Sequence, residues 1–250
     1  MVALSSSSTS SRYQRQMALS DFGLEGQQRL HAAHVLLVGA GGLGSAAAPY
    51  LVGAGIGTLT LADDDHVSLT NLHRQVLYNE ADIGLSKANT ACQRLSARNV
   101  DVDCRAIACR LEGSALQDAV AAADLVLDCT DNLATRRAIN ACCVALQTPW
   151  IHASVARLQG QLTVFAPPFS HGCYHCLFPE EAPAAPGPLP ILGPLPGIFG
   201  AMQALEAIRW LVNNDSPLTH TITLFDGQHQ HWQTLERTAH PHCSVCGTHS

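Results

Sequence analysis

A short apolar run that leads into a cluster of glycines is the feature that most constrains how this chain can fold. Residues 35–38 are all apolar, and the sequence GAGGLG follows at 39–44. The apolar run is typical of a parallel strand that is covered on both faces. The glycines of the turn are Gly39, Gly41, Gly42 and Gly44. They let the backbone turn sharply and approach a phosphate, so the pattern predicts a Rossmann-like α/β fold with a helix over about 43–52.

A second strand is predicted at 58–62, and it ends next to the carboxylate of Asp63. In dinucleotide-binding folds, an acid at this place accepts hydrogen bonds from ribose hydroxyls. The glycine turn alone is a weak signal, because such turns also occur in α/β proteins that bind no nucleotide. The residues after Asp63 are therefore needed to decide what the turn binds.

The stretch after this acid carries polar side chains that suit a triphosphate better than a nicotinamide ring. They are Asp64, Asp65, Asn71, Arg74, Gln75 and Lys87. Arginine offers a planar fork to phosphate oxygens and lysine offers a compact charge, so Arg74 and Lys87 could stabilise a leaving pyrophosphate. Each residue alone could be a solvated surface group. The apolar Leu69 and Leu72 in the same stretch argue against a solvated loop.

Residues 123–129 form another predicted buried strand, and Asp131 and Asn132 emerge at its carboxyl end. Ligands of open α/β sheets bind at that end of the strands. The carboxylate of Asp131 suits Mg²⁺, which prefers one or two carboxylates together with phosphate oxygens and water. The alternative is that Asp131 caps the helix predicted to start near Ala134, a role for which Asn132 competes.

Two CxxC motifs give the second strong signal. Their cysteines are Cys173, Cys176, Cys243 and Cys246. Four thiolates in two short turns, a pair of zinc knuckles, are typical of a tetrahedral structural Zn²⁺ site, which would tie the C-terminal segment to the sheet. A redox-active CxxC pair is the alternative. Neighbouring histidines could also replace a cysteine as ligand; they are His171, His175 and His242.

Composition restricts the cellular setting and the partners. The chain has ten cysteines among 250 residues and no apolar N-terminal segment, which predicts reduced thiols and a cytoplasmic location. The net charge of -6 argues against binding to nucleic acid, and no apolar run is long enough to enter a membrane as a span. With 47% hydrophobic residues and no internal repeat, the simplest interpretation is one domain at 12–250 after a disordered polar tail at 1–11.

Within this domain we expect a nucleotide-binding half at 34–148 and a second half at 149–250. Residues 12–30 are predicted to be helical. Seven prolines at 179–197 favour an extended crossover loop and argue against a regular helix there. The other expected elements are strands PWIHASV and GQLTVFAP with a turn at Gly160, a core or dimer helix at 198–212, and antiparallel strands at 221–225 and 232–235.

Four short motifs and one lysine, five features in all, resemble those of the ThiF/MoeB family, the bacterial relatives of ubiquitin-activating enzymes. They are GAGGLG at 39–44, ADDD at 62–65, NLHRQ at 71–75, Lys87, and DCTDN at 128–132. The resemblance extends from about Arg12 to Gly247. It implies an adenylyltransferase that uses ATP and Mg²⁺ to activate the C-terminal glycine of a ubiquitin-like sulfur carrier protein ending in GlyGly, for thiamine or molybdopterin synthesis. It also implies that the second half of the chain faces this carrier.

The resemblance further implies roles for single residues. The first acid would bind ribose, Asn71 and the two cations would hold phosphates, and Asp131 would support Mg²⁺. The nucleotide-binding set comprises the four glycines, Asp63, Asp65, Asn71, Arg74, Gln75, Lys87, Asp131 and Asn132; the catalytic set comprises Arg15, Arg74, Lys87 and Asp131. Arg15 belongs to the sequence RYQRQ at 12–16. In the family this arginine reaches the active site of the other subunit of a homodimer; the alternative is an exposed surface arginine.

Smaller details distinguish members of the family. LADDD and LFDG resemble ThiF more than MoeB, which favours thiamine synthesis, but the crossover loop lacks the cysteine that ThiF carries there. No sulfurtransferase domain follows Ser250, so we expect a separate protein to donate the sulfur. The alternatives are a MoeB-like enzyme, activation of another carrier or of a peptide, a noncatalytic adaptor, and a nicotinamide-dependent oxidoreductase. An oxidoreductase would leave Arg74, Lys87 and Asp131 without a purpose, and an adaptor would be expected to lose the cations.

Overall fold

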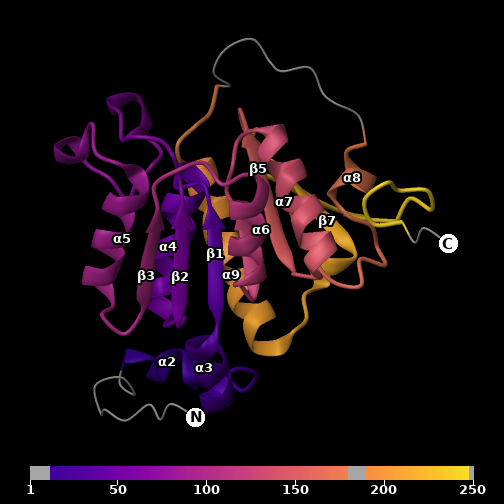
Figure 1. Ribbon diagram of the computed structural model, residues 1–250, viewed down its shortest axis with the longest axis horizontal. Coiled ribbons are helices and arrows are strands. Elements are labelled where there is room, and N and C mark those ends of the chain that lie inside the picture. Colours follow the sequence, from indigo (N-terminus) through magenta and orange to yellow (C-terminus); the bar gives the residue numbers. More distant parts are fainter. Residues whose placement is uncertain (1–11, 180–189, 248–250) are drawn as a thin grey trace.

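An eight-stranded mixed sheet forms the centre of the computed structural model, which describes residues 12–179 and 190–247 (Figure 1). The strand order is β3-β2-β1-β4-β5-β6-β7-β8. The pairs from β3 to β5 are parallel, and the pairs from β5 to β8 are antiparallel. This is the mostly parallel α/β sheet with added antiparallel strands that the sequence predicts. The expected tail at 1–11 and most of the expected crossover loop lie outside the described residues.

The elements follow one another in an order that alternates strands and helices in the first half of the chain. The strands are β1 (His34–Val38), β2 (Thr58–Ala62), β3 (Asp103–Ile107), β4 (Leu125–Asp128), β5 (Trp150–Ala156), β6 (Gln159–Phe165), β7 (Thr221–Asp226) and β8 (His231–Glu236). The helices are α2 (Gln14–Met17), α3 (Gly23–Ala32), α4 (Gly42–Ala54), α5 (Lys87–Arg98), α6 (Gly113–Ala121), α7 (Leu133–Leu146), α8 (Tyr174–Leu177) and α9 (Pro194–Asn213).

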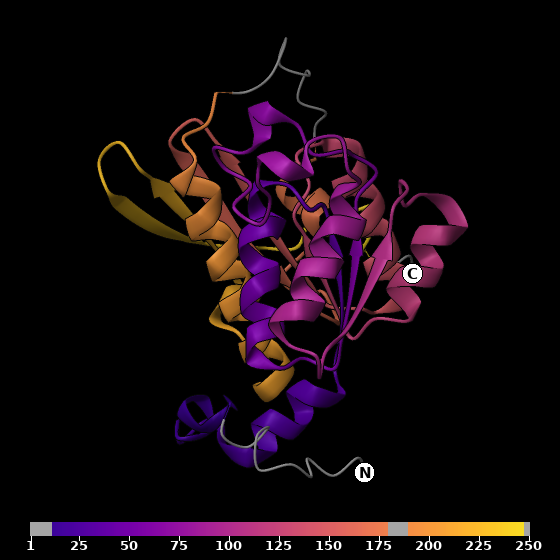
Figure 2. The ribbon, with the colours of Figure 1, turned by 90° about the vertical axis from the view of Figure 1, so that its left-hand side faces the viewer.

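Helices cover both faces of the parallel strands, and each face has its own hydrophobic core. Leu37 of β1 belongs to the core with α4, α5 and α9, whereas its neighbour Leu36 belongs to the core with α6 and α7. Successive residues of a strand point to opposite faces, which explains why the whole strand is apolar. Helices α4 and α9 pack side by side on one face (Figure 2). The two layers hold the carboxyl ends of the strands in fixed positions.

The turn between β5 and β6 differs from the sequence prediction. We expected the turn at Gly160, but the strands turn at 157–158, where Arg157 has a φ of 56°, and Gly160 lies within β6 opposite Val155. A Cβ placed on Gly160 would lie 2.0 Å from Cε2 of the buried Phe199. The glycine therefore serves the packing of α9 on the sheet, and its presence does not mark a turn.

Helix α9 begins earlier than predicted, and the N-terminal helical segment is interrupted. We expected a helix at 198–212 because prolines break helices, yet Pro194 and Pro196 stand in its first turn, where a missing N–H costs nothing. The predicted helical segment 12–30 contains α2 and α3 with a break between them. Among the described residues, we find no helix with the length and the apolar character that a membrane span requires.

Candidate nucleotide site and cysteine cluster

The glycine turn joins β1 to α4 and leaves the first backbone N–H groups of this helix without a side-chain cap. Gly39 has a φ of 97°, a conformation that favours glycine. A Cβ on Gly44 would lie 2.0 Å from the Gly39 carbonyl oxygen, so no larger residue fits there. The uncapped N–H groups, together with the positive end of the helix dipole, form an arrangement suited to an anion such as phosphate.

Two side chains from other elements hold this turn in place. One carboxylate oxygen of Asp63 accepts the Ala40 N–H at 2.6 Å, and the other accepts the Asp65 N–H at 2.8 Å. Burial raises the pKa of Asp63, and both hydrogen bonds oppose that shift. The hydroxyl of the buried Tyr78 lies 3.0 Å from the Ala40 carbonyl oxygen and 3.3 Å from that of Lys87. Tyr78 thus connects the glycine turn to the start of α5, a role that the sequence analysis missed.

Lys87 is the first residue of α5 and is almost completely buried. Its ammonium nitrogen lies 2.8 Å from a carboxylate oxygen of Asp65, whose side chain is 71% exposed. The Lys87 N–H also donates to the Asp65 carbonyl at 3.0 Å. Asp65 therefore keeps the ammonium group near the carboxyl end of β2, where Asp63 lies.

Arg74 and Gln75 approach the turn from the loop after the short helix Leu69–Asn71. Gln75 is only 3% exposed, and its Oε1 has no hydrogen-bond partner among the described residues. Its Nε2 would lie 3.6 Å from a Cβ placed on Gly41. A Cβ on Gly42 would lie 2.9 Å from Pro196 Cβ and 3.6 Å from Arg74 Cγ. This loop and the first turn of α9 therefore both border the glycine turn, and an unpartnered buried amide faces it.

Asn71 and Arg74 make different contacts in this loop. The Asn71 carbonyl accepts the N–H groups of Arg74 and Gln75 at 3.0 Å each, so its backbone shapes the loop. Its side-chain amide has no hydrogen bond to another described residue. One Arg74 nitrogen donates to the Thr70 carbonyl at 3.1 Å, and its side chain is half-buried. We therefore find Arg74 near the turn without a carboxylate partner in the described part of the chain.

The DCTDN segment lies against the same turn. A Cβ on Gly39 would lie 2.7 Å from the Cys129 carbonyl oxygen, so the two strand ends are in contact. Asn132 caps α7, because its side chain accepts the Thr135 N–H at 2.9 Å. Asp131 is exposed, and no described residue hydrogen-bonds to its carboxylate. The cap of α7 is therefore Asn132 and not Asp131. The Asp131 carboxylate remains accessible at the carboxyl end of β4.

A buried polar cluster behind Asp131 was missed by the sequence analysis. Asp128 is fully buried; it accepts His152 Nδ1 at 2.7 Å and the Thr130 hydroxyl and N–H at 2.6 and 3.0 Å. Arg136 Nη2 donates to the Thr130 carbonyl at 2.7 Å. Every polar group of Thr130 is therefore fixed, which orients the residue that precedes Asp131. The sequence signal for this cluster is a carboxylate, Asp128, inside an otherwise apolar strand.

The Asp128 and His152 side chains influence each other's ionisation. Burial lowers the pKa of His152 and outweighs the opposing effect of the hydrogen bond that His152 donates to Asp128. Burial alone would raise the pKa of Asp128, but hydrogen bonds from His152 and Thr130 and the charge of Arg136 lower it below the ordinary value. We therefore describe this pair as a neutral imidazole that donates from Nδ1 to an ionised carboxylate.

Arg15 lies far from the glycine turn of its own chain. It belongs to the short helix α2, and the preceding Tyr13 packs against Gly55 and accepts a hydrogen bond from Asn99 at 2.7 Å. Asn99 follows the C-terminus of α5, whose 12 residues span about 18 Å from Lys87. Figure 1 shows α2 at the end of the sheet opposite to the turn between β1 and α4. The exposed Arg15 is thus not brought together with the other predicted site residues within one chain.

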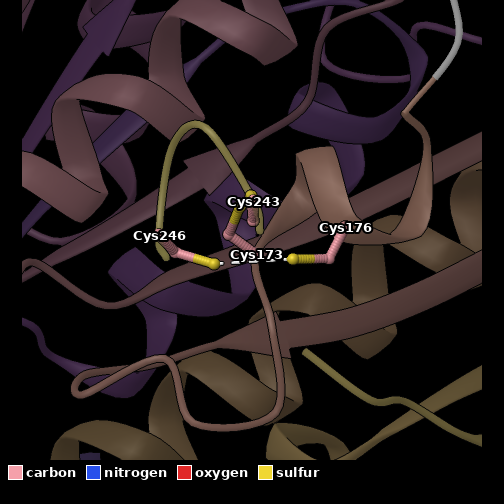
Figure 3. A group of neighbouring side chains, drawn as sticks. All are labelled: Cys173, Cys176, Cys243 and Cys246. Carbon is pink, nitrogen blue, oxygen red and sulfur yellow. Dashed lines mark hydrogen bonds between the residues drawn. The ribbon is translucent and has the colours of Figure 1, made fainter. Parts of the chain in front are cut away.

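The four predicted metal ligands converge at a separate place (Figure 3). Cys176 belongs to α8, and Asn140 of α7 contacts Cys173. The four sulfur atoms all lie within 4.8 Å of one another, with 3.8 Å between Cys173 and Cys243 and 3.5 Å between Cys176 and Cys246. A disulfide would need about 2.05 Å. Four sulfurs at about 2.3 Å from a tetrahedral zinc ion lie about 3.8 Å apart, so the cluster fits Zn²⁺.

Hydrogen bonds to the sulfur atoms support the cluster from outside. The Asn140 side chain donates to Cys173, and backbone N–H groups of His240 and Val245 donate to Cys176 and Cys243, at 3.4–3.5 Å. Such donors orient thiolate ligands and spread their charge. No neighbouring histidine is grouped with the four sulfurs in the described part of the chain. The ligand set that the geometry favours is therefore four cysteines.

Together these features define a class of protein: an α/β protein with a Rossmann-like sheet, an uncapped glycine turn bordered by lysine, arginine and carboxylate groups, and a four-cysteine cluster. Residues 13–245 match the model of the ThiF family, and the chain belongs to this family. The resemblance seen in the five sequence features is thus confirmed over nearly the whole chain.

Individual relatives extend this finding. The sulfur carrier protein ThiS adenylyltransferase of Escherichia coli is 49% identical, with 94% of each chain covered. The molybdopterin-synthase adenylyltransferase of Salmonella typhimurium is 39% identical, with 94% of this chain and 96% of the relative covered. The crystal structure of E. coli MccB with ATP matches with a TM-score of 0.81 at 25% identity, covering 94% of this chain and 73% of that chain.

Proposed function

We propose that this chain adenylates the C-terminal glycine of a ubiquitin-like sulfur carrier protein, with a ThiS-type carrier of thiamine synthesis as the preferred substrate. The observation that carries the proposal is the uncapped glycine turn with Lys87 and Arg74 on one side and the accessible carboxylate of Asp131 on the other. The similarity to a ThiS adenylyltransferase over nearly the whole chain supports the choice of substrate class.

The reaction joins a carboxylate oxygen of the carrier to the α-phosphorus of ATP. The bond from that phosphorus to the oxygen shared with the β-phosphate breaks, and pyrophosphate leaves with the bonding electrons. The enzyme needs no covalent intermediate for this step, so its work is to position two anions and to stabilise the charge on the leaving group. Arg74 and Lys87 supply positive charge, and the N–H groups of the glycine turn supply oriented donors.

Asp65 has a specific part in this scheme. It holds the Lys87 ammonium group at 2.8 Å while its own side chain is largely exposed. The phosphates of an incoming nucleotide would compete for the same ammonium group, because charge-assisted hydrogen bonds to phosphate are strong. Asp63 would bind ribose through lone pairs that its two backbone hydrogen bonds leave available. Asn71, Gln75 and Asn132 complete the proposed nucleotide site, where Gln75 Nε2 lies beside Gly41 and Gln75 Oε1 has no hydrogen-bond partner among the described residues.

The proposal includes two metal ions with different tasks. Asp131 would hold Mg²⁺, which neutralises phosphate charge when it is bound. The four cysteines would hold a structural Zn²⁺ that joins the C-terminal segment to α8. In this proposal residues 34–148 bind the nucleotide, and residues 149–250 face the carrier, while a separate protein donates sulfur.

A homodimer is part of the same proposal because Arg15 cannot reach the glycine turn of its own chain. Helices α3 and α4 each pack against α9, and all three carry exposed apolar side chains. Leu24 is 58% exposed, Tyr50 is 58% exposed and Leu205 is 62% exposed. Apolar surface of this kind is typical of contacts between subunits. We propose that this face joins two chains, and that Arg15 of each chain completes the site of the other.

The MoeB-like alternative is favoured by one observation, the 39% identity to a molybdopterin-synthase adenylyltransferase over a similar share of the chain. It requires the same chemistry with a different carrier. Parallel assays with a ThiS-type and a MoaD-type carrier distinguish the two. We expect at least tenfold more activity with the ThiS-type carrier, and the opposite preference would favour the molybdopterin pathway.

Exchange of labelled pyrophosphate into ATP tests the proposed function. We expect exchange only when a carrier ending in GlyGly is present, and a loss of about a hundredfold or more in Arg74→Ala and Lys87→Ala, because each removes an oriented charge from the leaving group. Arg105→Ala, which alters an exposed ion pair on β3, is the matched control and should remain active. Near-normal exchange in both site variants would contradict the phosphate assignment, and tight binding of NADH in place of ATP would favour the oxidoreductase alternative.

A further inference from the structure

Arg237, the residue after β8, is a buried cation whose hydrogen-bond partners are all neutral. It is only 6% exposed. Its guanidinium group donates to four backbone carbonyls, at 2.7 Å to Val164, 2.6 Å to Thr219, 3.2 Å to Gly172 and 3.4 Å to Thr221. The same group lies 4.4 Å from the centre of the Phe165 ring. No carboxylate among the described residues forms an ion pair with it.

Such an arrangement needs a counter-charge. Carbonyl oxygens and an aromatic ring satisfy the hydrogen bonds of a guanidinium group, but they carry no net charge, and a buried unpaired cation is costly. Burial lowers the pKa of Arg237 to about 10, so the group is still protonated near neutral pH. The negative charge that balances it should therefore lie close by in the interior.

The segment that begins at Arg237 runs directly over the first CxxC turn. One of the four carbonyls that Arg237 binds belongs to Gly172, the residue before Cys173. A Cβ on Gly172 would lie 3.0 Å from the Cα of Ala239, and the His240 N–H donates to Cys176 Sγ at 3.4 Å. Arg237 thus stands at the point where the C-terminal segment meets the cysteine cluster.

A zinc-loaded cysteine cluster supplies the negative charge that balances Arg237. Four thiolates and one Zn²⁺ together carry two negative charges. We propose that Arg237 is the buried counter-ion of this tetrathiolate site and fixes the Gly172 carbonyl next to its first ligand. The inference rests on the zinc site of the proposed function, and it assigns Arg237 as a positioning residue for the metal.

Zinc affinity measured by competition with a chelator tests this role. We expect Arg237→Gln to bind zinc about 10–100-fold more weakly than the wild type, the range typical for groups that support metal ligands. Arg237→Lys, which keeps the charge but cannot span four carbonyls, should stay within about threefold. Arg29→Gln is the matched control, because Arg29 also donates to a distant carbonyl, Val212 at 2.7 Å, but is exposed and paired with Glu25.

The absorption of the Co²⁺-substituted protein gives a second readout. Removing a positive charge near the sulfurs makes them easier to oxidise, so the sulfur-to-cobalt charge-transfer band of Arg237→Gln should move to lower energy, while that of Arg237→Lys should not. If Arg237→Gln fails to fold, Arg237→Lys decides the question, because a purely hydrogen-bonding role predicts more than tenfold weaker zinc binding for it.

The outcomes separate this inference from the zinc site itself. A wild-type chain that takes up no zinc would contradict the zinc proposal. A wild-type chain that binds one zinc ion, together with a folded Arg237→Gln chain of unchanged affinity and unchanged cobalt spectrum, would overturn the role of Arg237 alone. An Arg237→Lys chain that loses as much affinity as Arg237→Gln would overturn it as well.

Discussion

Asp128 and His152 are two buried residues whose importance lies in their pairing. The Asp128 carboxylate orients Thr130, which precedes the proposed Mg²⁺ ligand, and His152 provides one of its hydrogen bonds at 2.7 Å. Burial lowers the pKa of His152 from its ordinary value of 6.5. In the unfolded chain this histidine takes up a proton near pH 6.5, whereas in the folded chain it does so only at lower pH.

This difference predicts a pH-dependent contribution to stability. The unfolded state binds more protons below about pH 6.5, so the free energy of unfolding falls as the pH decreases, by up to about 1.4 kcal/mol per pH unit. His152→Asn keeps a donor for Asp128 but cannot titrate. We expect the stability advantage of the wild type over His152→Asn, measured by urea unfolding, to shrink as the pH falls from 7.5 to 5.5, by up to about 1.4 kcal/mol in total. Parallel curves for the two chains would contradict a neutral, buried His152.

Single residues also show what can be predicted from sequence. Gly39, Gly44 and the four cysteines were found because their chemistry restricts them to few structural roles. The choice between Asp131 and Asn132 as helix cap could not be made, since both residue types cap helices equally well. Tyr78 could not be found at all, because its role depends on a contact between the glycine turn and α5, which are far apart in the chain.

Gly160 illustrates the same lesson for an element, the strand β6. The sequence predicted both strands of the hairpin, but placed the turn at this glycine, because glycine is common in turns and the position of α9 is not visible in the chain. The structure shows that the glycine makes room for Phe199. The start of α9 was predicted too late for a related reason: the first turn of a helix tolerates proline, whereas its middle does not.

A matched pair of glycine substitutions tests this packing. In Gly160→Ala the new Cβ would lie 2.0 Å from Phe199, so α9 must shift, and we expect a loss of about 1–3 kcal/mol in the free energy of unfolding. In Gly197→Ala the new Cβ meets nothing within 4 Å, and a helix favours alanine by about 1 kcal/mol. Urea unfolding of both variants measures the difference. Equal stability of the two would show that the contact with Phe199 is not rigid.

At the scale of the whole molecule, the proposed site is complete only when two chains combine. Helix α2 lies at the opposite end of α5 from Lys87, so Arg15 can serve a glycine turn only in another subunit. The sequence supplied the motif that contains Arg15. The separation of Arg15 from the glycine turn of its own chain could not be predicted, because it depends on how the helices and strands are arranged in the folded chain.

Mixed dimers test this arrangement. Arg15→Ala chains and Lys87→Ala chains should each be nearly inactive in pyrophosphate exchange. After subunit exchange, hybrid dimers would contain one site with both residues intact, and part of the activity should return. Mass spectrometry of the intact assembly verifies that hybrids form. If hybrid dimers form but recover no activity, Arg15 is an exposed surface arginine without a role in the site of the other subunit.

The central claim is that this chain forms an acyl adenylate on a sulfur carrier, and intact-mass analysis of the carrier tests it most directly. The chain, ATP, Mg²⁺ and a ThiS-type carrier are incubated with pyrophosphatase, which removes the product that would reverse the reaction. We predict a carrier species heavier by one adenylyl group that disappears on treatment with hydroxylamine and does not form with Lys87→Ala. A carrier of unchanged mass, in the presence of a folded wild-type chain that binds ATP, would contradict the account.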